Sequence, residues 1–361
     1  MVDFDALEAA GIANARERAA LIEYLDGLGF TAEEMVAAER HGRLFGLAGD
    51  ALQRTGKPIY TLRRAADELG VSVPALVQAW SALGLNVADA DQPVFSQVDL
   101  DGLAAWVALR AAVGEDATMT LLRVLGASMA RLAEAGSTAI RLGLPDIQME
   151  HSRDELKTAI AYQAVGEFIP RLAVLIGAVF RHHTISARTY FEGVVRDATA
   201  SVICGVGFAD LTGFTSLTQR LTPTELSQLL VEFAAAVSDV VLADGGRIVK
   251  FIGDEVMWVS STPEQLAKVA LDLVEHPQAR EAELKVRAGL GYGRVLAIAG
   301  DYFGTAVNLA ARLVGAAAPG QILASSDVRD ELPGWAAIRQ EPLLLKGFDT
   351  PVTAYDLHLS R

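Results

Sequence analysis

The chain has 361 residues, a formal net charge of −14 and a hydrophobic fraction of 51%. This length exceeds what one ordinary core supports, so it predicts two domains, and the apolar fraction excludes a largely disordered chain. The acidic excess argues against binding to nucleic acid or anionic membranes unless a local basic patch overrides it.

The cysteine count and the N-terminal residues indicate where the protein works. Cys204 is the only cysteine, so no internal disulfide can form. The acidic start, MVDFDALEAAG, lacks the basic residues and apolar core of a signal peptide. The most lipid-like run, LAVLIGAVF at residues 172–180, is too short to span a bilayer. We therefore expect a cytoplasmic protein without a transmembrane segment.

Residues 1–183 are expected to form an all-helical domain. Capping signals and apolar residues at helical spacing predict helices over 31–49, 96–114, 116–136 and 152–169. Short loops favour helices packed side by side. The high Ala, Leu and Val content raises the hypothesis that a lipid or fatty acid binds in a groove between these helices.

Residues 60–85 show the pattern helix, Leu-Gly-Val-Ser, helix, which is typical of a helix-turn-helix. Its second helix contains no Lys or Arg, and a recognition helix without a cation reads DNA poorly. We therefore favour a structural helical hairpin over a transcription regulator. We expect no nucleic-acid partner.

Residues 184–199 are expected to connect two domains. His182 and His183 stand at the start of this polar stretch. Histidine titrates near pH ~6.5, so protonation of this pair is one hypothesis for regulating a following domain. The competing interpretation is two solvated loop histidines without a regulatory role.

After about residue 200 the pattern changes to alternating strands and helices. The order is strand, helix, strand, strand, helix, strand, followed by a helix and further strands, with a hairpin predicted within 286–300. This order is the ferredoxin-like arrangement. The whole chain is thus predicted to be α+β, with an all-α part first.

Two carboxylates follow the ends of neighbouring central strands in this arrangement. Asp210 ends the first strand, and Asp254 opens the third through a tight Gly-Asp turn. Two adjacent carboxylates repel unless a cation lies between them, and hard oxygen ligands suit Mg²⁺ or Mn²⁺. The backbone N–H groups at Gly213, Phe214 and Thr215 then point at a phosphate. The alternative is that both acids are only turn and cap residues.

The stretch VKFIGDEVMW at residues 249–258 also holds Lys250, four residues before Asp254. In an extended strand they stand about 13 Å apart, too far to pair with each other. We therefore expect them to serve different sites. Glu255 is predicted to be a structural turn or strand residue.

Four separated motifs resemble the catalytic domain of the class III nucleotidyl cyclases, over residues 200–361. They are FADLTGFTSLT, KFIGDEVM, GDYFGTAVNLAAR and LLLKGFDTPVTAYDL, in the order of that family. The arrangement of a helical domain before one cyclase domain resembles soluble actinobacterial, in particular mycobacterial, adenylyl cyclases, whose N-terminal region is regulatory.

The resemblance implies roles for the residues at the matching positions. Asp210, Asp254 and the Leu211 carbonyl hold two Mg²⁺ or Mn²⁺ ions per active site. Lys250 and Asp301 contact adenine. The remaining implied contacts are Asn308 to the ribose, Arg312 to the α-phosphate, and Lys346, Phe214 and Thr215 to the triphosphate. Alternatively, Lys346 is a solvated loop lysine.

The resemblance also implies the reaction and the assembly. Adenine offers ring acceptors to an ammonium group and an NH₂ group to a carboxylate, whereas guanine's O6 repels the carboxylate, so this pair favours ATP. We expect an adenylyl cyclase that works as a homodimer with shared sites. The alternative is a nucleotide-binding module without turnover. The Gly-Gly-Asp/Glu-Glu-Phe turn of a diguanylate cyclase is absent.

Overall fold

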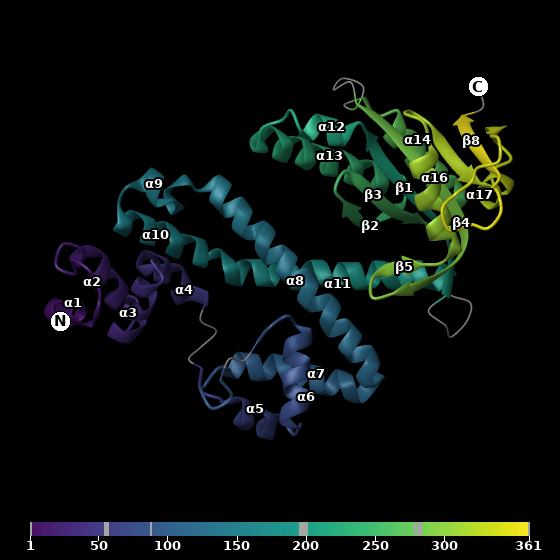
Figure 1. The fold of residues 1–361 in the computed structure, drawn as a ribbon. Helices are drawn as coiled ribbons and strands as arrows, with labels where there is room; N and C mark the ends of the chain where they lie inside the picture. The colour runs from purple at the N-terminus through teal and green to yellow at the C-terminus, as the bar shows by residue number, and fades with distance from the viewer. Residues whose placement is uncertain are drawn as a thin grey trace. The chain divides into compact units, whose positions relative to one another are not determined.

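The computed structural model describes residues 2–53, 58–86, 89–194, 201–277, 279 and 284–359. The chain divides into two compact units, Met1–His182 and His183–Arg361. The first unit is helical and the second contains a sheet covered by helices (Figure 1). Residues 195–199 of the predicted connector lie outside the described residues.

The helical unit follows the predicted pattern with one difference. Its elements are α1 Phe4–Ala10, α2 Ala19–Gly27, α3 Ala32–Arg40, η1 Leu44–Gly46, α4 Leu47–Gln53, α5 Leu62–Leu69, α6 Val73–Ala82, α7 Gln97–Val113, α8 Glu115–Gly143, η2 Pro145–Ile147, α9 Met149–Ser152, α10 Glu155–Gly166 and α11 Phe168–Val194. The single helix expected over 31–49 is wrong, because the chain turns at Gly42, whose φ is +65°. At that φ, glycine is the residue without steric cost.

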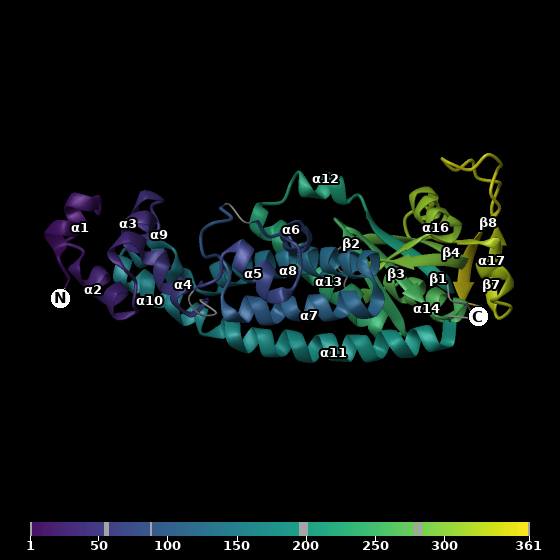
Figure 2. The same cartoon turned by 90° about the horizontal axis from the view of Figure 1, so that it is seen from below.

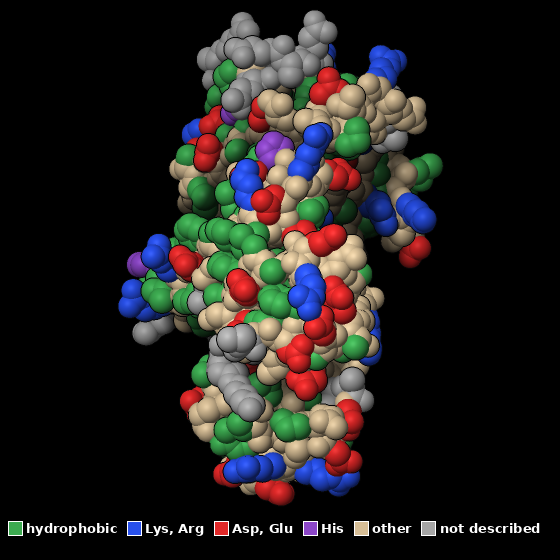
Figure 3. Space-filling view, turned by 90° about the vertical axis from the view of Figure 1, so that its left-hand side faces the viewer, with side chains coloured by type: hydrophobic (Ala, Val, Ile, Leu, Met, Phe, Trp, Pro, Cys, Tyr) green, Lys and Arg blue, Asp and Glu red, His purple; other side chains and the backbone are tan. Residues whose placement is uncertain are grey.

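The predicted helix-turn-helix is α5 and α6, joined through Gly70. Arg63 and Arg64 lie in the first helix and pair with Asp91 and Glu68. On the face drawn in Figure 3, basic side chains are scattered among acidic ones and form no stripe. These observations accord with a structural hairpin.

The two histidines of the expected connector lie within a helix and not in a loop, but the alternative that they are solvated and have no regulatory role stays open. Both are exposed on α11. By length and composition alone, Glu155–Ala187 and Pro223–Ala243 are long and apolar enough to cross a membrane, a test that core helices of soluble proteins also pass. The absence of a transmembrane segment therefore stays an expectation.

The second unit is built on one mixed sheet. Its elements are β1 Ser201–Thr212, α12 Phe214–Thr218, α13 Pro223–Ala243, β2 Gly246–Ile252, β3 Glu255–Ser260, α14 Pro263–Val274, β4 Lys285–Ile298, β5 Asp301–Phe303, α16 Thr305–Ala316, β6 Ile322–Ser325, α17 Ser326–Asp330, β7 Trp335–Arg339 and β8 Ala354–Leu359. The strand order is β2-β3-β1-β4-β6-β8-β7, with β5 paired to β4. Its first four strands have the ferredoxin-like order, so that prediction is confirmed.

Alternation along β1 and β3 gives the sheet two apolar faces. One face carries Ala209, Leu211 and Trp258 and packs against α13 and α14. The other carries Phe208 and Met257 and packs against α16. Asp210 projects on this second face, because it alternates with Ala209 and Leu211. The second face therefore carries the candidate site.

Glycines in β4 allow α16 to lie directly on the sheet. A Cβ on Gly289 would lie 2.3 Å from the Ala310 carbonyl oxygen, and one on Gly291 would lie 2.4 Å from that of Ala306. Because backbone atoms cannot yield as a flexible side chain can, the glycines set how closely α16 sits. The hairpin predicted within 286–300 is misplaced, because residues 285–298 form one strand and the turn at Ala299-Gly300 leads to β5.

Candidate active site

The two predicted metal-binding carboxylates lie beside each other. Asp210 is opposite Glu255 in the β1–β3 register, and the turn through Gly253, with φ of +65°, brings Asp254 to the same end. Burial raises the pKa of Asp254, and the charge and hydrogen bonding of Asp210 raise it further. The predicted proximity of the two acids is therefore borne out, and it concentrates negative charge at one point.

Glu255, expected to be a structural residue, belongs to this acidic group. Burial raises the pKa of its carboxyl, and the negative charges of Asp210 and Asp254 raise it again. The sequence signal was present, since Glu255 follows Asp254 directly. Its strand position, however, decides that it faces Asp210 across the sheet.

Arg287 balances the acidic group and was missed from the sequence. Its Nη2 and Nε donate to Asp210 Oδ2 at 2.6 and 3.0 Å. Its Nη1 donates to the carbonyl oxygens of Gly315 and Ala317, both at 3.3 Å, at the end of α16. Arg287 thus fixes the acidic end of β1 to the helix that carries Asn308. A basic residue within a strand otherwise rich in glycine and apolar residues was the available signal.

The two predicted adenine contacts form an ion pair within the chain. Lys250 Nζ donates to Asp301 Oδ2, and the backbone N–H of Tyr302 donates to Asp301 Oδ1 at 2.8 Å. The Lys250 and Asp301 side chains remain 38% and 28% exposed, so a ligand can reach both. Because the charges of Lys250 and Asp301 neutralise each other, both side chains can lie beside an apolar face of the sheet.

A second contact holds the same two strands together. Arg247 on β2 donates through Nη2 to the hydroxyl of Tyr302, whose ring is 3% exposed. A β-bulge between Ile248 and Lys250 breaks the two-residue alternation of β2. As a result, Arg247 and Lys250 both reach β5, and we call these two contacts the β2–β5 clamp. Arg247 was not predicted.

The predicted ribose and α-phosphate contacts lie on α16. Asn308 and Arg312 are one helical turn apart. Arg312 Nε donates to the carbonyl oxygen of Lys346 at 3.1 Å, which ties the helix to the loop after β7. The Lys346 side chain is exposed. Arg312 and Lys346 are therefore neighbours in space although their motifs are separate in sequence.

The remaining predicted contacts depend on backbone atoms. Leu211 lies in β1 with its side chain 3% exposed in the core. Phe214 begins α12, and its ring packs against the same core, so only its backbone remains for a ligand. Thr215 lies in α12, and its side chain lies outside the described part of the chain.

The predicted metal and adenine contacts fall into two groups within one chain, and the structure adds Glu255, Arg287 and Arg247 to them. The acidic group is Asp210, Asp254 and Glu255 with Arg287, and the purine group is the β2–β5 clamp. Among the described residues, no side-chain hydrogen bond or ion pair joins Asp210 or Asp254 to Lys250, Asp301 or Arg312. The two groups are thus held by separate contacts in the described part of the chain.

Family models match both units. The adenylate and guanylate cyclase catalytic domain matches residues 197–358, and the adenylate cyclase regulatory domain matches residues 4–185. The chain belongs to the adenylate cyclase family. The cyclase fold, the helical regulatory region and the enzyme class predicted from the sequence are confirmed.

Relatives of this cyclase cover most of its length. The uncharacterized protein Rv2212 of Mycobacterium tuberculosis is 67% identical over 99% of this chain and 94% of its own. An adenylate cyclase of Streptomyces coelicolor is 33% identical over 76% of this chain and 71% of its own. A pH-sensitive adenylate cyclase of Mycobacterium tuberculosis, MT1302, is 31% identical over 88% of this chain and 80% of its own.

Proposed function

We propose that this cyclase converts ATP to 3′,5′-cyclic AMP and pyrophosphate. The observation that carries the choice of ATP is the Lys250–Asp301 pair, whose ammonium and carboxylate match the acceptors and the NH₂ group of adenine. Tyr302 and Arg247 hold this pair in place before a nucleotide arrives. GTP is disfavoured because its O6 faces the carboxylate and leaves a polar group unpaired.

The acidic group fits a divalent cation. Asp210 and Asp254 lie beside each other, burial and the charge of Asp210 raise the pKa of Asp254, and the Arg287 guanidinium pairs with Asp210. No set of three or more His, Cys, Asp or Glu side chains among the described residues is placed to hold a metal by itself. Two carboxylates with the Leu211 carbonyl therefore leave ligand positions for substrate phosphate oxygens.

Mg²⁺ or Mn²⁺ bound there, two ions per site, supplies acidity to the ribose 3′-hydroxyl and neutralises the triphosphate. The chain's own groups then position the reactants. Asn308 orients the ribose, and Arg312 stabilises the charge that grows on the α-phosphate as the 3′-oxygen attacks. Lys346 and the backbone N–H groups of Phe214 and Thr215 bind the triphosphate.

We propose a homodimer in which each site takes the acidic group from one chain and the purine group from the other. This arrangement is supported because, among the described residues, no side-chain hydrogen bond or ion pair joins Asp210 or Asp254 to Lys250 or Asp301. Apolar side chains near the groups support it as well, since Phe251, Ile252 and Phe303 are 39%, 51% and 49% exposed. A second chain would cover these side chains and complete both sites.

Regulation is proposed to come from residues 1–183 through α11. His182 and His183 are exposed on this helix at the division between the two units, and a 31% identical relative is named as pH-sensitive. Changing both histidines to alanine should then flatten the dependence of activity on mildly acidic pH. An unchanged profile would refute the histidine hypothesis.

Apolar side chains on the same helix support the lipid hypothesis, since Val174 and Phe180 are 74% and 65% exposed. Mass spectrometry of lipid extracted from the purified full-length protein tests it, and finding no lipid would count against it. We also propose a cytoplasmic location, where ATP is available and a lone cysteine stays reduced.

One assay tests the function. Purified protein is incubated with ATP or GTP, each with Mg²⁺ or Mn²⁺, and the products are identified. We expect cyclic AMP from ATP, little product from GTP, and none from Asp254→Ala. ATP binding without a cyclic product would favour a nucleotide-binding signalling module instead.

A further inference from the structure

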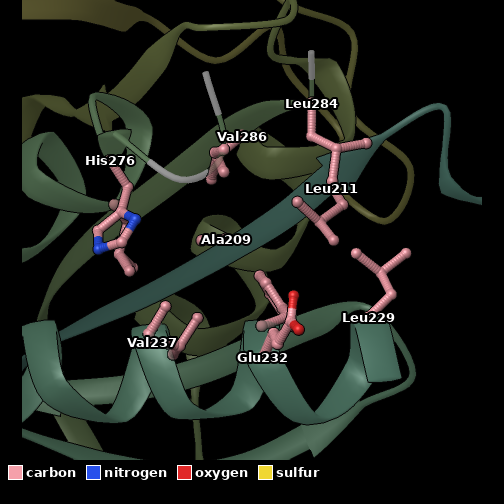
Figure 4. Close-up of a pocket in the computed structure, with 12 residues that line it drawn as sticks. Ala209, Leu211, Leu229, Glu232, Val237, His276, Leu284 and Val286 are labelled. Atoms are coloured by element: carbon pink, nitrogen blue, oxygen red, sulfur yellow. The ribbon is translucent and has the colours of Figure 1, made fainter. Parts of the chain in front are cut away.

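A cavity of about 490 Å³ lies between the sheet and α13, on the face of β1 opposite to Asp210. Figure 4 shows α13 along one side and β1 crossing behind. The lining residues are Ala209, Leu211, Leu229, Glu232, Phe233, Ala236, Val237, Leu273, His276, Ala279, Leu284 and Val286.

The cavity exists because small residues line it where the helix and the sheet face each other. Ala209, Ala236 and Ala279 are too short to fill this space. The floor is apolar, with Leu211 and Val286 only 3% and 4% exposed. Native interiors leave few voids larger than a water molecule, and a space of this size falls within the range of small-molecule sites.

Two polar side chains stand on opposite sides of the cavity. In Figure 4 the carboxylate of Glu232 and the imidazole of His276 both turn toward the open space. The Gln228 amide donates to Glu232 Oε1 at 2.9 Å. Among the described residues, no Lys, Arg or His nitrogen lies within ion-pair distance of the Glu232 carboxylate. The Glu232 side chain is exposed, so its carboxylate is available to pair with a cationic ligand that enters the cavity.

We propose that this cavity binds a small amphiphilic amine. Its apolar body lies on the floor formed by Leu211, Val237 and Val286, and its protonated nitrogen pairs with Glu232. His276 offers a second hydrogen bond from the opposite side. The net charge of −14 also favours a cationic ligand over an anionic one.

The cavity shares a strand with the catalytic residues. Ala209 and Leu211 line it, and Asp210 lies between them with its side chain on the other face. A ligand that fills the cavity fixes β1 and thereby the position of Asp210. This coupling rests on the proposed catalytic role of Asp210, whereas binding itself does not. By linkage, ATP and the amine must alter each other's affinity by the same factor.

Three probes with the same alkyl chain test the binding. Calorimetric titrations of the full-length protein use 1-octylamine, 1-octanol and octanoate, which differ only in the head group. We expect the amine to bind roughly three- to tenfold tighter than the alcohol, a modest gain because solvent weakens an ion pair with the exposed Glu232. Octanoate should bind weakest, because Glu232 repels its carboxylate. Equal binding of the three probes would overturn the proposal.

Variants of α13 assign the binding to this cavity. Glu232→Gln should remove the preference for amine over alcohol while the alcohol still binds. Ala236→Phe projects a ring into the space and should weaken the binding of both. Asp239→Asn changes an exposed acid on the same helix outside the cavity and should bind as the unchanged protein does. Amine binding that is not weakened in folded Ala236→Phe, or a preference retained by Glu232→Gln, would refute the site.

The coupling is measured separately. Saturating 1-octylamine should change the KM for ATP or kcat in the unchanged protein and leave Ala236→Phe unaffected. Amine binding with unchanged kinetics would refute the coupling and leave the binding site intact. Because calorimetry needs no cyclase activity, failure of the proposed function and failure of this inference are distinguishable.

Discussion

Complementation between two inactive variants tests the division of the site between chains. Lys250 belongs to the purine group, where it pairs with Asp301, and Asp254 belongs to the acidic group, where its carboxyl faces Asp210. We expect Lys250→Ala and Asp254→Ala, each expressed alone, to retain less than roughly one hundredth of the activity, since each removes a charge from both sites of its dimer.

The expected recovery follows from symmetry. In a mixed dimer, one site combines the changed acidic group with the changed purine group, and the other site combines the two unchanged groups. Mixed dimers isolated with two different affinity tags should therefore have about half of the wild-type activity per dimer. An unsorted co-expression mixture, in which about half of the dimers are mixed, should show about a quarter.

The matched control pairs two changes within one group. Mixed dimers of Asp210→Ala and Asp254→Ala carry one lesion in each site, so no recovery is expected. Activity measured as cyclic AMP formed per purified mixed dimer decides between the cases. Inactive Lys250/Asp254 mixed dimers, or recovery in the Asp210/Asp254 control, would refute the shared site.

Three further outcomes test the packing of the second unit. Tyr302→Phe removes the acceptor of Arg247 and should lower the ratio of kcat/KM for ATP to that for GTP; an unchanged ratio would show that the clamp does not position the purine pair. Gly289→Ala should lower the melting temperature and kcat, because the new methyl group meets the backbone of α16, while the open Gly315→Ala should be tolerated. Burial raises the pKa of Asp244, with Asp272 adding to the shift and Lys268 opposing it. Since a raised carboxyl pKa costs stability above that pKa, Asp244→Asn should stabilise the fold at neutral pH, and the gain should shrink as pH falls through the raised pKa. A gain that grows at low pH in thermal melts would contradict this sign.

The site motifs could be recognised in the sequence because the proposed cyclase chemistry depends on residue types at short spacings. Asp210, Asp254, Asn308 and Arg312 each sit in a stretch whose apolar pattern also predicts the strand or helix that carries it. The positions of α5, α6 and α7 could also be predicted from local sequence, because caps and glycine turns mark their ends. The break after α3 was missed, because a single Gly42 interrupts a pattern that is otherwise continuous.

The contacts between these elements required the tertiary structure. Arg287 meets Asp210 only because β1 and β4 pair in one register, and Arg247 meets Tyr302 only because a bulge turns β2 toward β5. A shift of one residue in either pairing would send these side chains to the opposite face, and no local pattern encodes that choice. The cavity behind β1 likewise depends on the gap between α13 and the sheet. Local spacing therefore determined which residues are candidates for the proposed chemistry, and long-range strand register decided which charges neutralise one another and where space remains for a ligand.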